Sequence, residues 1–254
     1  MTALRLDNVS KRFGGVIASD NVDITVPAGE IIGLIGPNGA GKTTIVNMIT
    51  GLLPVTGGTI RVGETDITHA PAHEICRAGL ARTFQNIRLL NEASVLDNVV
   101  IGFHRHETSS LLSALLGLPA AARETREMKS RAMALLADFG LEDYADYPAG
   151  GLSYGHQRKV EMARALAADP SFILLDEPIA GMNDVESDAL AEIFRGFAAG
   201  GRGVLLIEHN VRFVARLCSH VYVLDGGRLI SEGPPDHVLN DPAVIAAYLG
   251  GEHA

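Results

Sequence analysis

The apolar run IIGLI at residues 31–35 is followed at once by GPNGAGKTT at residues 36–44. A glycine-rich turn between a buried strand and a helix points successive backbone N–H groups inward, and the helix adds its positive end, so this stretch predicts a phosphate-binding P-loop. Lys42 is expected to reach the β- and γ-phosphates, and the Thr43 hydroxyl to bind Mg²⁺. The residues expected to line the nucleotide are Gly36, Pro37, Asn38, Gly39, Ala40, Gly41, Lys42, Thr43 and Thr44.

A second apolar run, FILL at residues 172–175, ends in two carboxylates, Asp176 and Glu177. The run is typical of a buried parallel strand, and ligands of such sheets bind beyond the carboxyl ends of the strands. Both acids are therefore expected at the phosphate site. Asp176 would hold Mg²⁺ through its water shell, and Glu177 would polarise the attacking water.

The segment LSYGHQR at residues 152–158, the signature segment below, precedes a stretch whose alanines and apolar residues recur at helical spacing. Ser153 is placed to cap that helix. Its hydroxyl, the amide of Gly155 and the helix N-terminus together offer a second anion site. Because the P-loop already surrounds its own phosphates on one side, we interpret this second edge as serving the nucleotide of another subunit. A capped surface helix is the alternative.

Two further side chains, Gln85 and His209, are candidates for the phosphate site. Gln85 follows a short strand expected at residues 81–83, and a glutamine at a strand end can reach both Mg²⁺ and the attacking water. His209 stands where the apolar run GVLLI at residues 203–207 leaves the sheet, and we expect it to contact the γ-phosphate. Taken alone, the glutamine would be interpreted as solvated and the histidine as structural.

The order of these five segments, from residue 4 to about residue 233, resembles that of the ATP-binding subunits of ABC transporters. The resemblance implies an ATPase that uses ATP and Mg²⁺. Its fold would be α/β, a P-loop NTPase core with N-terminal antiparallel β strands and an inserted helical subdomain. Phe13 falls where the family stacks adenine, and residues 180–183 (AGMN) fall at the D-loop, which crosses the dimer interface. The positions that depart from the usual glycine, glutamine and aspartate are Tyr154, His156 and Asn183.

Within that family, the chain resembles the ATPases of bacterial branched-chain, or hydrophobic, amino-acid importers. Urea and short-amide importer ATPases look much the same. The lipopolysaccharide-export ATPase ranks third, because it shares the Tyr-Leu-Gly ending but typically lacks the Thr-Phe-Gln-Asn form found here at residues 83–86. A soluble, non-transport ABC ATPase is the alternative from another class, although such proteins carry paired ATPase domains or long coiled-coil insertions. The likeness rests on ARTFQNIRLL at 81–90, LSYG at 152–155, GMN at 181–183, IEHN at 207–210 and AAYLG at 246–250.

The resemblance also implies partners and a location. Two ATPase subunits, identical or paralogous, would sandwich two ATP molecules between the P-loop of one and the signature segment of the other. Their closure would pull on two integral-membrane permease subunits, and a periplasmic or extracellular solute-binding protein would take part indirectly. The ATPase would then lie on the cytoplasmic face of the inner membrane, attached peripherally through the permeases.

Composition agrees with this interpretation. The chain has 254 residues, of which 47% are hydrophobic, and its formal net charge of −9 argues against a nucleic-acid surface. Its longest apolar stretches, such as residues 111–122, are shorter than the roughly 20 residues of a membrane span, and the N-terminus lacks a signal-peptide core. Membrane attachment should therefore be indirect. Cys76 and Cys218 lack Cys-x-x-Cys spacing, so we expect reduced packing residues and no zinc site.

The pattern predicts one ABC ATP-binding domain over residues 1–254. Its core would cover about 1–85 and 151–233, followed by a tail at 234–254 of two short helices broken at Asp241-Pro242, and residues 86–150 would form the helical subdomain. The P-loop helix is expected from about Lys42 to Thr50. Strands are expected at 4–9, 23–26, 31–35, 203–208, 220–225 and 228–232.

Overall fold

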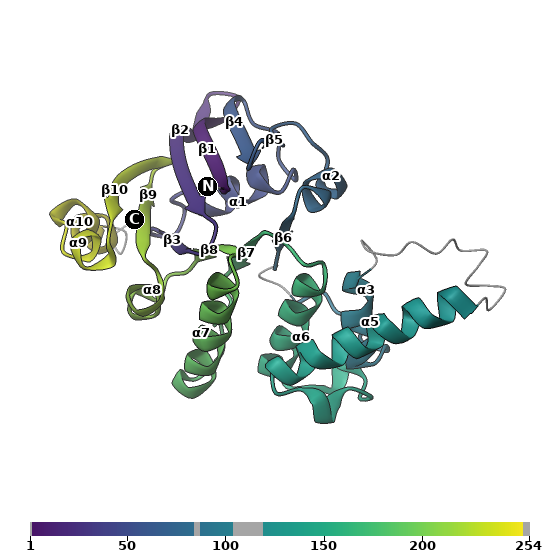
Figure 1. The fold of residues 1–254 in the computed structure, drawn as a ribbon. Coiled ribbons are helices and arrows are strands. Elements are labelled where there is room, and N and C mark those ends of the chain that lie inside the picture. The colour runs from purple at the N-terminus through teal and green to yellow at the C-terminus, as the bar shows by residue number, and fades with distance from the viewer. Residues whose placement is uncertain (1, 84–86, 104–118, 251–254) are drawn as a thin grey trace. The chain divides into compact units, whose positions relative to one another are not determined.

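The computed structural model describes residues 2–83, 87–103 and 119–250, which divide into two compact units (Figure 1). The first unit comprises residues 1–82, 171–178 and 194–254, and the second comprises residues 83–170 and 179–193. The expected helical subdomain falls within the second unit, which also contains the helix that follows Ser153.

A six-stranded sheet organises the described part of the first unit. Its strands β3, β8 and β7 are buried at every residue, because a parallel strand covered on both faces requires apolar side chains on both. All neighbouring strands run parallel except β10, which pairs antiparallel with β9. In spatial order the strands are β10 (Arg228–Gly233), β9 (His220–Asp225), β3 (Ile31–Ile35), β8 (Gly203–Ile207), β7 (Phe172–Asp176) and β6 (Leu80–Arg82).

A second, antiparallel sheet belongs to the same unit. Its first two strands are longer than the expected 4–9 and 23–26, because the hairpin continues through register shifts that interrupt the alternation of buried and exposed residues. Its other two strands and the short helix α2 (Ala72–Arg77) were not predicted. In spatial order the strands are β2 (Val16–Pro27), β1 (Ala3–Phe13), β4 (Gly57–Val62) and β5 (Thr65–Asp66).

One hydrophobic core joins the two sheets to the helix α1 (Lys42–Ile49). It includes Leu6 from the antiparallel sheet, Leu34 and Leu174 from the parallel strands and Ile45 from α1, all nearly inaccessible to solvent. Burial of each such side chain contributes about 1.5–3 kcal/mol. The core therefore anchors both the strand that enters the P-loop and the helix that leaves it.

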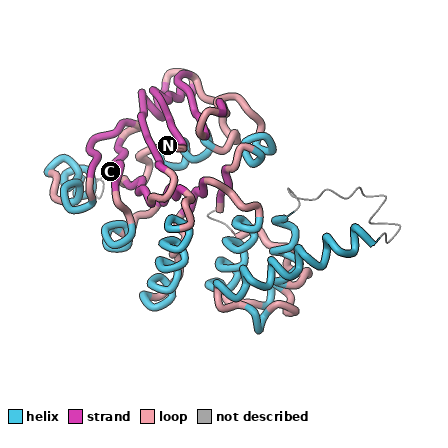
Figure 2. Tube along the Cα trace, in the orientation of Figure 1, coloured by secondary structure: helices cyan, strands magenta, loops and turns pink. Residues whose placement is uncertain are grey.

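The described part of the second unit is built from helices and loops (Figure 2). In it, α3 (Val95–Gly102) packs against α5 (Pro119–Asp138) and α6 (Tyr154–Ala167). The following helix, α7 (Asp184–Ala199), begins in the second unit and ends in the first. Across the described residues, no helix combines the length and the apolar character needed to cross a membrane.

The tail forms two short helices, α9 (Pro235–Leu239) and α10 (Pro242–Gly250), with the expected break at Asp241. Both helices contact β10, and Val238 is fully buried, so the tail packs on its own unit. The Asp241 carboxylate accepts a hydrogen bond from the Ser231 hydroxyl at 2.7 Å, which holds the pKa of that carboxyl below its usual range. This bond ties the break between the helices to β10.

Candidate nucleotide-binding site

The P-loop joins β3 to α1 along a backbone path that requires glycine at two positions. Gly36 has a φ of 152°, and a Cβ there would lie 2.0 Å from the carbonyl oxygen of Leu224. Gly41 has a φ of 104°, and its Cβ would lie 2.8 Å from the carbonyl oxygen of Ala18. Since neither position has room for a side chain, the loop can make the tight strand-to-helix turn that a phosphate site needs.

Lys42 folds back over this loop. Its Nζ donates hydrogen bonds to the carbonyl oxygens of Gly36 and Pro37 at 2.6 and 2.9 Å. Burial lowers the pKa of Lys42, and the nearby carboxylates of Glu177 and Asp176 oppose that shift. The ammonium and the two carboxylates therefore share one electrostatic environment beyond the ends of the parallel strands.

Asp176 is the last residue of β7 and is 7% exposed. Its Oδ2 accepts a hydrogen bond from Nη2 of Arg82 at 2.8 Å, so the two side chains form a buried ion pair. Arg82 ends β6, the strand next to β7. The sequence motifs predict no role for Arg82, because its pairing with Asp176 becomes evident only once β6 is known to lie beside β7.

Glu177 and His209 lie close together just beyond the adjacent strands β7 and β8. Nδ1 of His209 is 3.8 Å from Oε1 of Glu177, and the buried Glu208 carboxylate lies 3.9 Å from the same nitrogen. Glu177 has a φ of 48°, which is uncommon for a residue with a Cβ, and its N–H donates to the carbonyl oxygen of Ile207 at 2.9 Å. Strained backbone of this kind is concentrated at functional sites.

Phe13 lies at the end of β1, where the hairpin turns into β2, and is 50% exposed. Nζ of Lys11 lies 5.1 Å from the ring centroid, within the range of a cation–π contact. Lys11 is itself fixed by a hydrogen bond to the carbonyl oxygen of Pro54 at 2.6 Å. The ring is thus oriented by a neighbour yet open to solvent, which suits it to stacking on a base.

Ser153 caps α6, as the sequence predicts. Its Oγ accepts the N–H of His156 at 3.3 Å, and the hydroxyl keeps its own proton as a donor to a further acceptor. A Cβ on Gly155 would lie 3.3 Å from Oε1 of Glu186, the end of a flexible side chain. The signature segment thus presents a hydroxyl and a helix N-terminus, the groups expected of an anion site.

Tyr154 and His156, the two unusual residues of the signature segment, contact other residues of the second unit. A Cβ on Gly181 of the D-loop would lie 3.4 Å from the ring of Tyr154, so that ring lies beside the D-loop. His156 packs against Tyr144, with the ring centroids 4.8 Å apart. These side chains therefore brace the segment from within the second unit.

Asn183, the third unusual residue, lies just before α7 and forms a reciprocal cap with Glu186. Its Oδ1 accepts the N–H of Glu186, and the Glu186 carboxylate accepts the N–H of Asn183, both at 3.0 Å. An uncharged amide serves this purpose as well as a carboxylate would, because only an acceptor oxygen is needed.

The side-chain chemistry at the P-loop suits Mg²⁺. Thr43 and Asp176 offer hydroxyl and carboxylate oxygens, the hard ligands that this ion prefers. Within the described ranges, no group of three or more His, Cys, Asp or Glu side chains could hold a metal ion. Proteins commonly hold Mg²⁺ by one or two oxygens together with nucleotide phosphates, and Thr43 and Asp176 have the oxygens for such a site. Gln85, the remaining expected ligand, lies outside the described residues.

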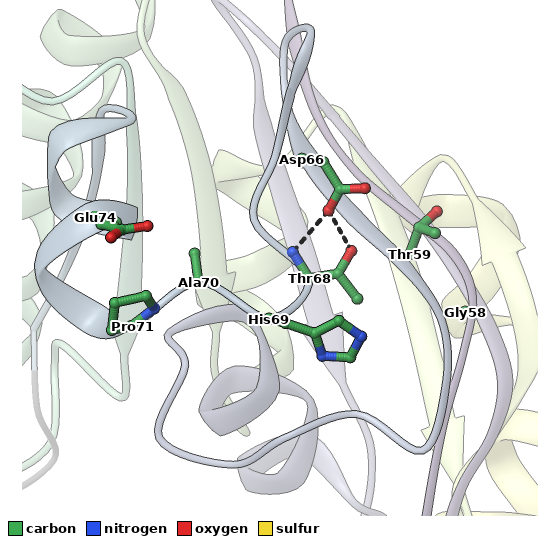
Figure 3. A pocket seen from close by; sticks show the side chains of 8 residues that line it. All are labelled: Gly58, Thr59, Asp66, Thr68, His69, Ala70, Pro71 and Glu74. Atoms are coloured by element: carbon green, nitrogen blue, oxygen red, sulfur yellow. Dashed lines mark hydrogen bonds between the residues drawn. The ribbon is translucent and has the colours of Figure 1, made fainter.

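A separate pocket of about 450 Å³ in the first unit is lined by residues between 58 and 74 (Figure 3). In it, Oδ1 of Asp66 accepts hydrogen bonds from the hydroxyl and the N–H of Thr68 at 2.6 and 2.9 Å, which hold the pKa of Asp66 below its usual range. None of the lining residues belongs to the expected nucleotide site. We therefore assign this pocket no part in binding nucleotide.

Comparison with known proteins agrees with this geometry. The ABC transporter family model matches residues 19–180, and the branched-chain amino acid ATP-binding cassette transporter model matches residues 228–254. BraF of Pseudomonas aeruginosa and LivG of Escherichia coli K12, both high-affinity branched-chain amino acid transport ATP-binding proteins, are each 38% identical over 97% of both chains. LptB of Escherichia coli K12, a lipopolysaccharide export system ATP-binding protein, is 37% identical over 98% of both chains.

Solved structures show the same fold. A nucleotide-free ATP-binding cassette from an ABC transporter has a TM-score of 0.84 and 36% identity, covering 96% of this chain and 98% of that one. The ADP conformation of another such cassette has a TM-score of 0.86 and 36% identity, covering 98% and 99%. The α/β P-loop fold predicted from the sequence is thus confirmed. The chain belongs to the ABC transporter family, as one of its ATP-binding proteins.

Proposed function

We propose that this chain is the ATP-hydrolysing subunit of an ABC importer that energises the uptake of branched-chain or other hydrophobic amino acids. The observation that carries the solute class is the match of residues 228–254 to the branched-chain amino acid ATP-binding cassette family. The likeness to BraF and LivG over nearly the whole chain supports the same solute class.

In the proposed site, the P-loop amides and Lys42 bind the β- and γ-phosphates, and Phe13 stacks on adenine. The Lys42 ammonium, which rests on two loop carbonyls, would pass to phosphate oxygens when the nucleotide binds. Thr43, Asp176 and Gln85 would hold Mg²⁺, which when bound neutralises charge on the phosphates.

Hydrolysis would depend on Glu177 and His209. Glu177 would accept a proton from the attacking water, and His209 would donate to the γ-phosphate. Nδ1 of His209 lies 3.8 Å from Oε1 of Glu177. This separation supports a joint role, because one side chain can contact the attacking water while the other contacts the phosphate that the water attacks. Gln85 would position the same water.

A second ATPase subunit, identical or paralogous, would complete each site. The Ser153 hydroxyl and the Gly155 amide would bind the nucleotide held by that subunit's P-loop, with Asn183 at the interface. We further propose that both compact units and the tail form one ATP-binding domain. It would act at the cytoplasmic face of the inner membrane, on two permease subunits served by a solute-binding protein.

A urea or short-amide importer and a lipopolysaccharide exporter are the alternatives within the family. The likeness to LptB favours the exporter, at nearly the same identity as the amino-acid transport proteins. The C-terminal match to the branched-chain amino acid family favours the amino-acid importer, and the TFQN sequence at residues 83–86 favours it over the exporter. A soluble, non-transport ABC ATPase would bind no permease.

The test is transport by the reconstituted complex. The chain would be co-expressed with the permeases and the solute-binding protein encoded beside it and placed in proteoliposomes. We expect ATP-dependent uptake of labelled leucine that competing isoleucine suppresses and urea does not. Transport of urea, extraction of lipopolysaccharide, or failure to bind any permease would each overturn the proposal.

A further inference from the structure

Arg82 links three elements of the candidate site within the first unit. Besides its 2.8 Å bond to Asp176, its Nη1 donates to Oδ1 of Asn47 at 2.8 Å and to Oγ1 of Thr50 at 3.3 Å. Asn47 lies in α1, and Thr50 is the C-cap of that helix. One guanidinium therefore connects the end of β6, the acid at the end of β7 and the helix that begins at Lys42.

These contacts fix the position of the guanidinium. Its donors form a rigid planar fork, so bonds to several partners define both its place and its plane. The Thr50 hydroxyl donates its proton to the carbonyl oxygen of Val46 at 2.8 Å, and its oxygen is therefore an acceptor toward Arg82. Arg82, which donates to Asp176, is thus itself held by hydrogen bonds to Asn47 and Thr50.

Stability alone does not account for this arrangement. The two side chains of the ion pair are only 9% and 10% exposed, so both charges have lost most of their hydration. Desolvation of that kind cancels much of the attraction between the charges, and apolar residues of similar volume often stabilise a fold at least as well. The carboxylate that the pair holds is the one expected to bind Mg²⁺.

We propose that Arg82 is a positioning residue that fixes the Asp176 carboxylate and thereby raises the affinity of the site for the Mg²⁺–nucleotide complex. The inference rests on the proposed ATP site but not on the transported solute. Loss of a partner that orients a metal-holding carboxylate typically costs roughly 10–100-fold in metal affinity. The reason is that a released side chain must be ordered again when the ligand binds.

The experiment measures binding of a fluorescent, non-hydrolysable ATP analogue to the full chain, in Mg²⁺ and in EDTA. Arg82→Gln should lose roughly tenfold or more of its affinity in Mg²⁺ and keep its affinity in EDTA. Asn47→Ala, which removes one support and leaves the ion pair, should lose a smaller factor in Mg²⁺ only. Arg61→Gln, the same charge change on an exposed strand residue, should match the unaltered chain.

Equal losses of affinity in Mg²⁺ and in EDTA would show that the pair only supports the fold, and unaltered affinity in both media would show that it positions nothing. Either result would overturn the inference and leave the proposed function intact. If Arg82→Gln fails to fold, as judged by circular dichroism, Asn47→Ala decides the matter. Absence of nucleotide binding by the unaltered chain would overturn the proposed function and the inference together.

Discussion

The P-loop edge of the first unit and the signature segment of the second are constructed in opposite ways. At the P-loop edge, the charged side chains are held by hydrogen bonds, Lys42 by two carbonyls of its own loop and Asp176 by Arg82 of the neighbouring strand. At the signature segment, Ser153 is exposed, Tyr154 is 47% exposed and the cap is made within its own helix. The charged groups of the first edge are held in place, which suits the proposed binding of its own nucleotide, whereas the second edge is an exposed surface, which suits the proposed binding of a nucleotide carried by another subunit.

The largest expected effect lies at the P-loop edge. Glu177→Gln should lower kcat for ATP hydrolysis by about 10²–10⁴, because it removes the carboxylate that activates water. Nucleotide affinity should persist, since Lys42 and Asp176 remain. Phosphate release would be measured, with the exposed Glu64→Gln as the matched control. Undiminished hydrolysis would assign the role to another group.

Lys42→Ala should weaken ATP binding by roughly ten- to a hundredfold, the value of a charge-assisted hydrogen bond. No other residue of the loop can supply that charge. The exposed Lys129→Ala, on α5, removes a charge far from the P-loop in sequence and should bind normally. Titration calorimetry would measure both variants. Unchanged affinity in a folded Lys42→Ala protein would exclude the P-loop as the phosphate site.

Paired glycine substitutions compare the two edges for stability. Gly36→Ala should lower the free energy of unfolding by about 2–4 kcal/mol, because its Cβ would meet the backbone of Leu224. Gly155→Ala should stay within about 1 kcal/mol of the unaltered chain, since only the flexible end of Glu186 is near and alanine favours helices. Urea unfolding would measure both values. Equal losses would show that the two edges are equally tight.

The smallest expected effect is a difference in thiol reactivity. It concerns Cys218, which lies beside the strand that enters the P-loop. Its Sγ lies beside Gly33 of β3, and burial raises the pKa of the thiol to about 12. Below that pH the thiol stays protonated and unreactive, because the thiolate is the nucleophile. At pH 8, a Cys76→Ser protein should therefore react with a thiol reagent far more slowly than a Cys218→Ser protein. Rapid labelling of Cys218 would contradict a tightly held first unit.

Local patterns were enough to predict much of the fold and the family. The strand before the P-loop, the strand that ends at Asp176, the Ser153 cap and the break at Asp241 each depend on neighbours in sequence. The ABC transporter family and the α/β P-loop fold were predicted from the order of the motifs and are confirmed. The assigned roles of the site residues stay predictions.

Other features depend on contacts that sequence alone does not reveal. The pair between Arg82 and Asp176 requires β6 to lie beside β7, and nothing local to either segment states that order. The strand signal is weak in both β4, which begins at Gly57-Gly58, and β5, which has only two residues. Pairing of β4 with β1, and of β5 with β4, provides the support that their own sequences lack.

The central claim is that the signature segment forms the second half of an ATP site on a partner subunit. Light scattering at saturating ATP tests it, using Glu177→Gln alone and together with Ser153→Arg, with the paralogous ATPase present if the natural dimer is mixed. We predict that Glu177→Gln accumulates ATP-bound dimers, and that the double variant binds ATP but stays monomeric because the arginine blocks the opposing γ-phosphate. A Glu177→Gln protein that remains monomeric, or a double variant that still dimerises, would contradict the claim.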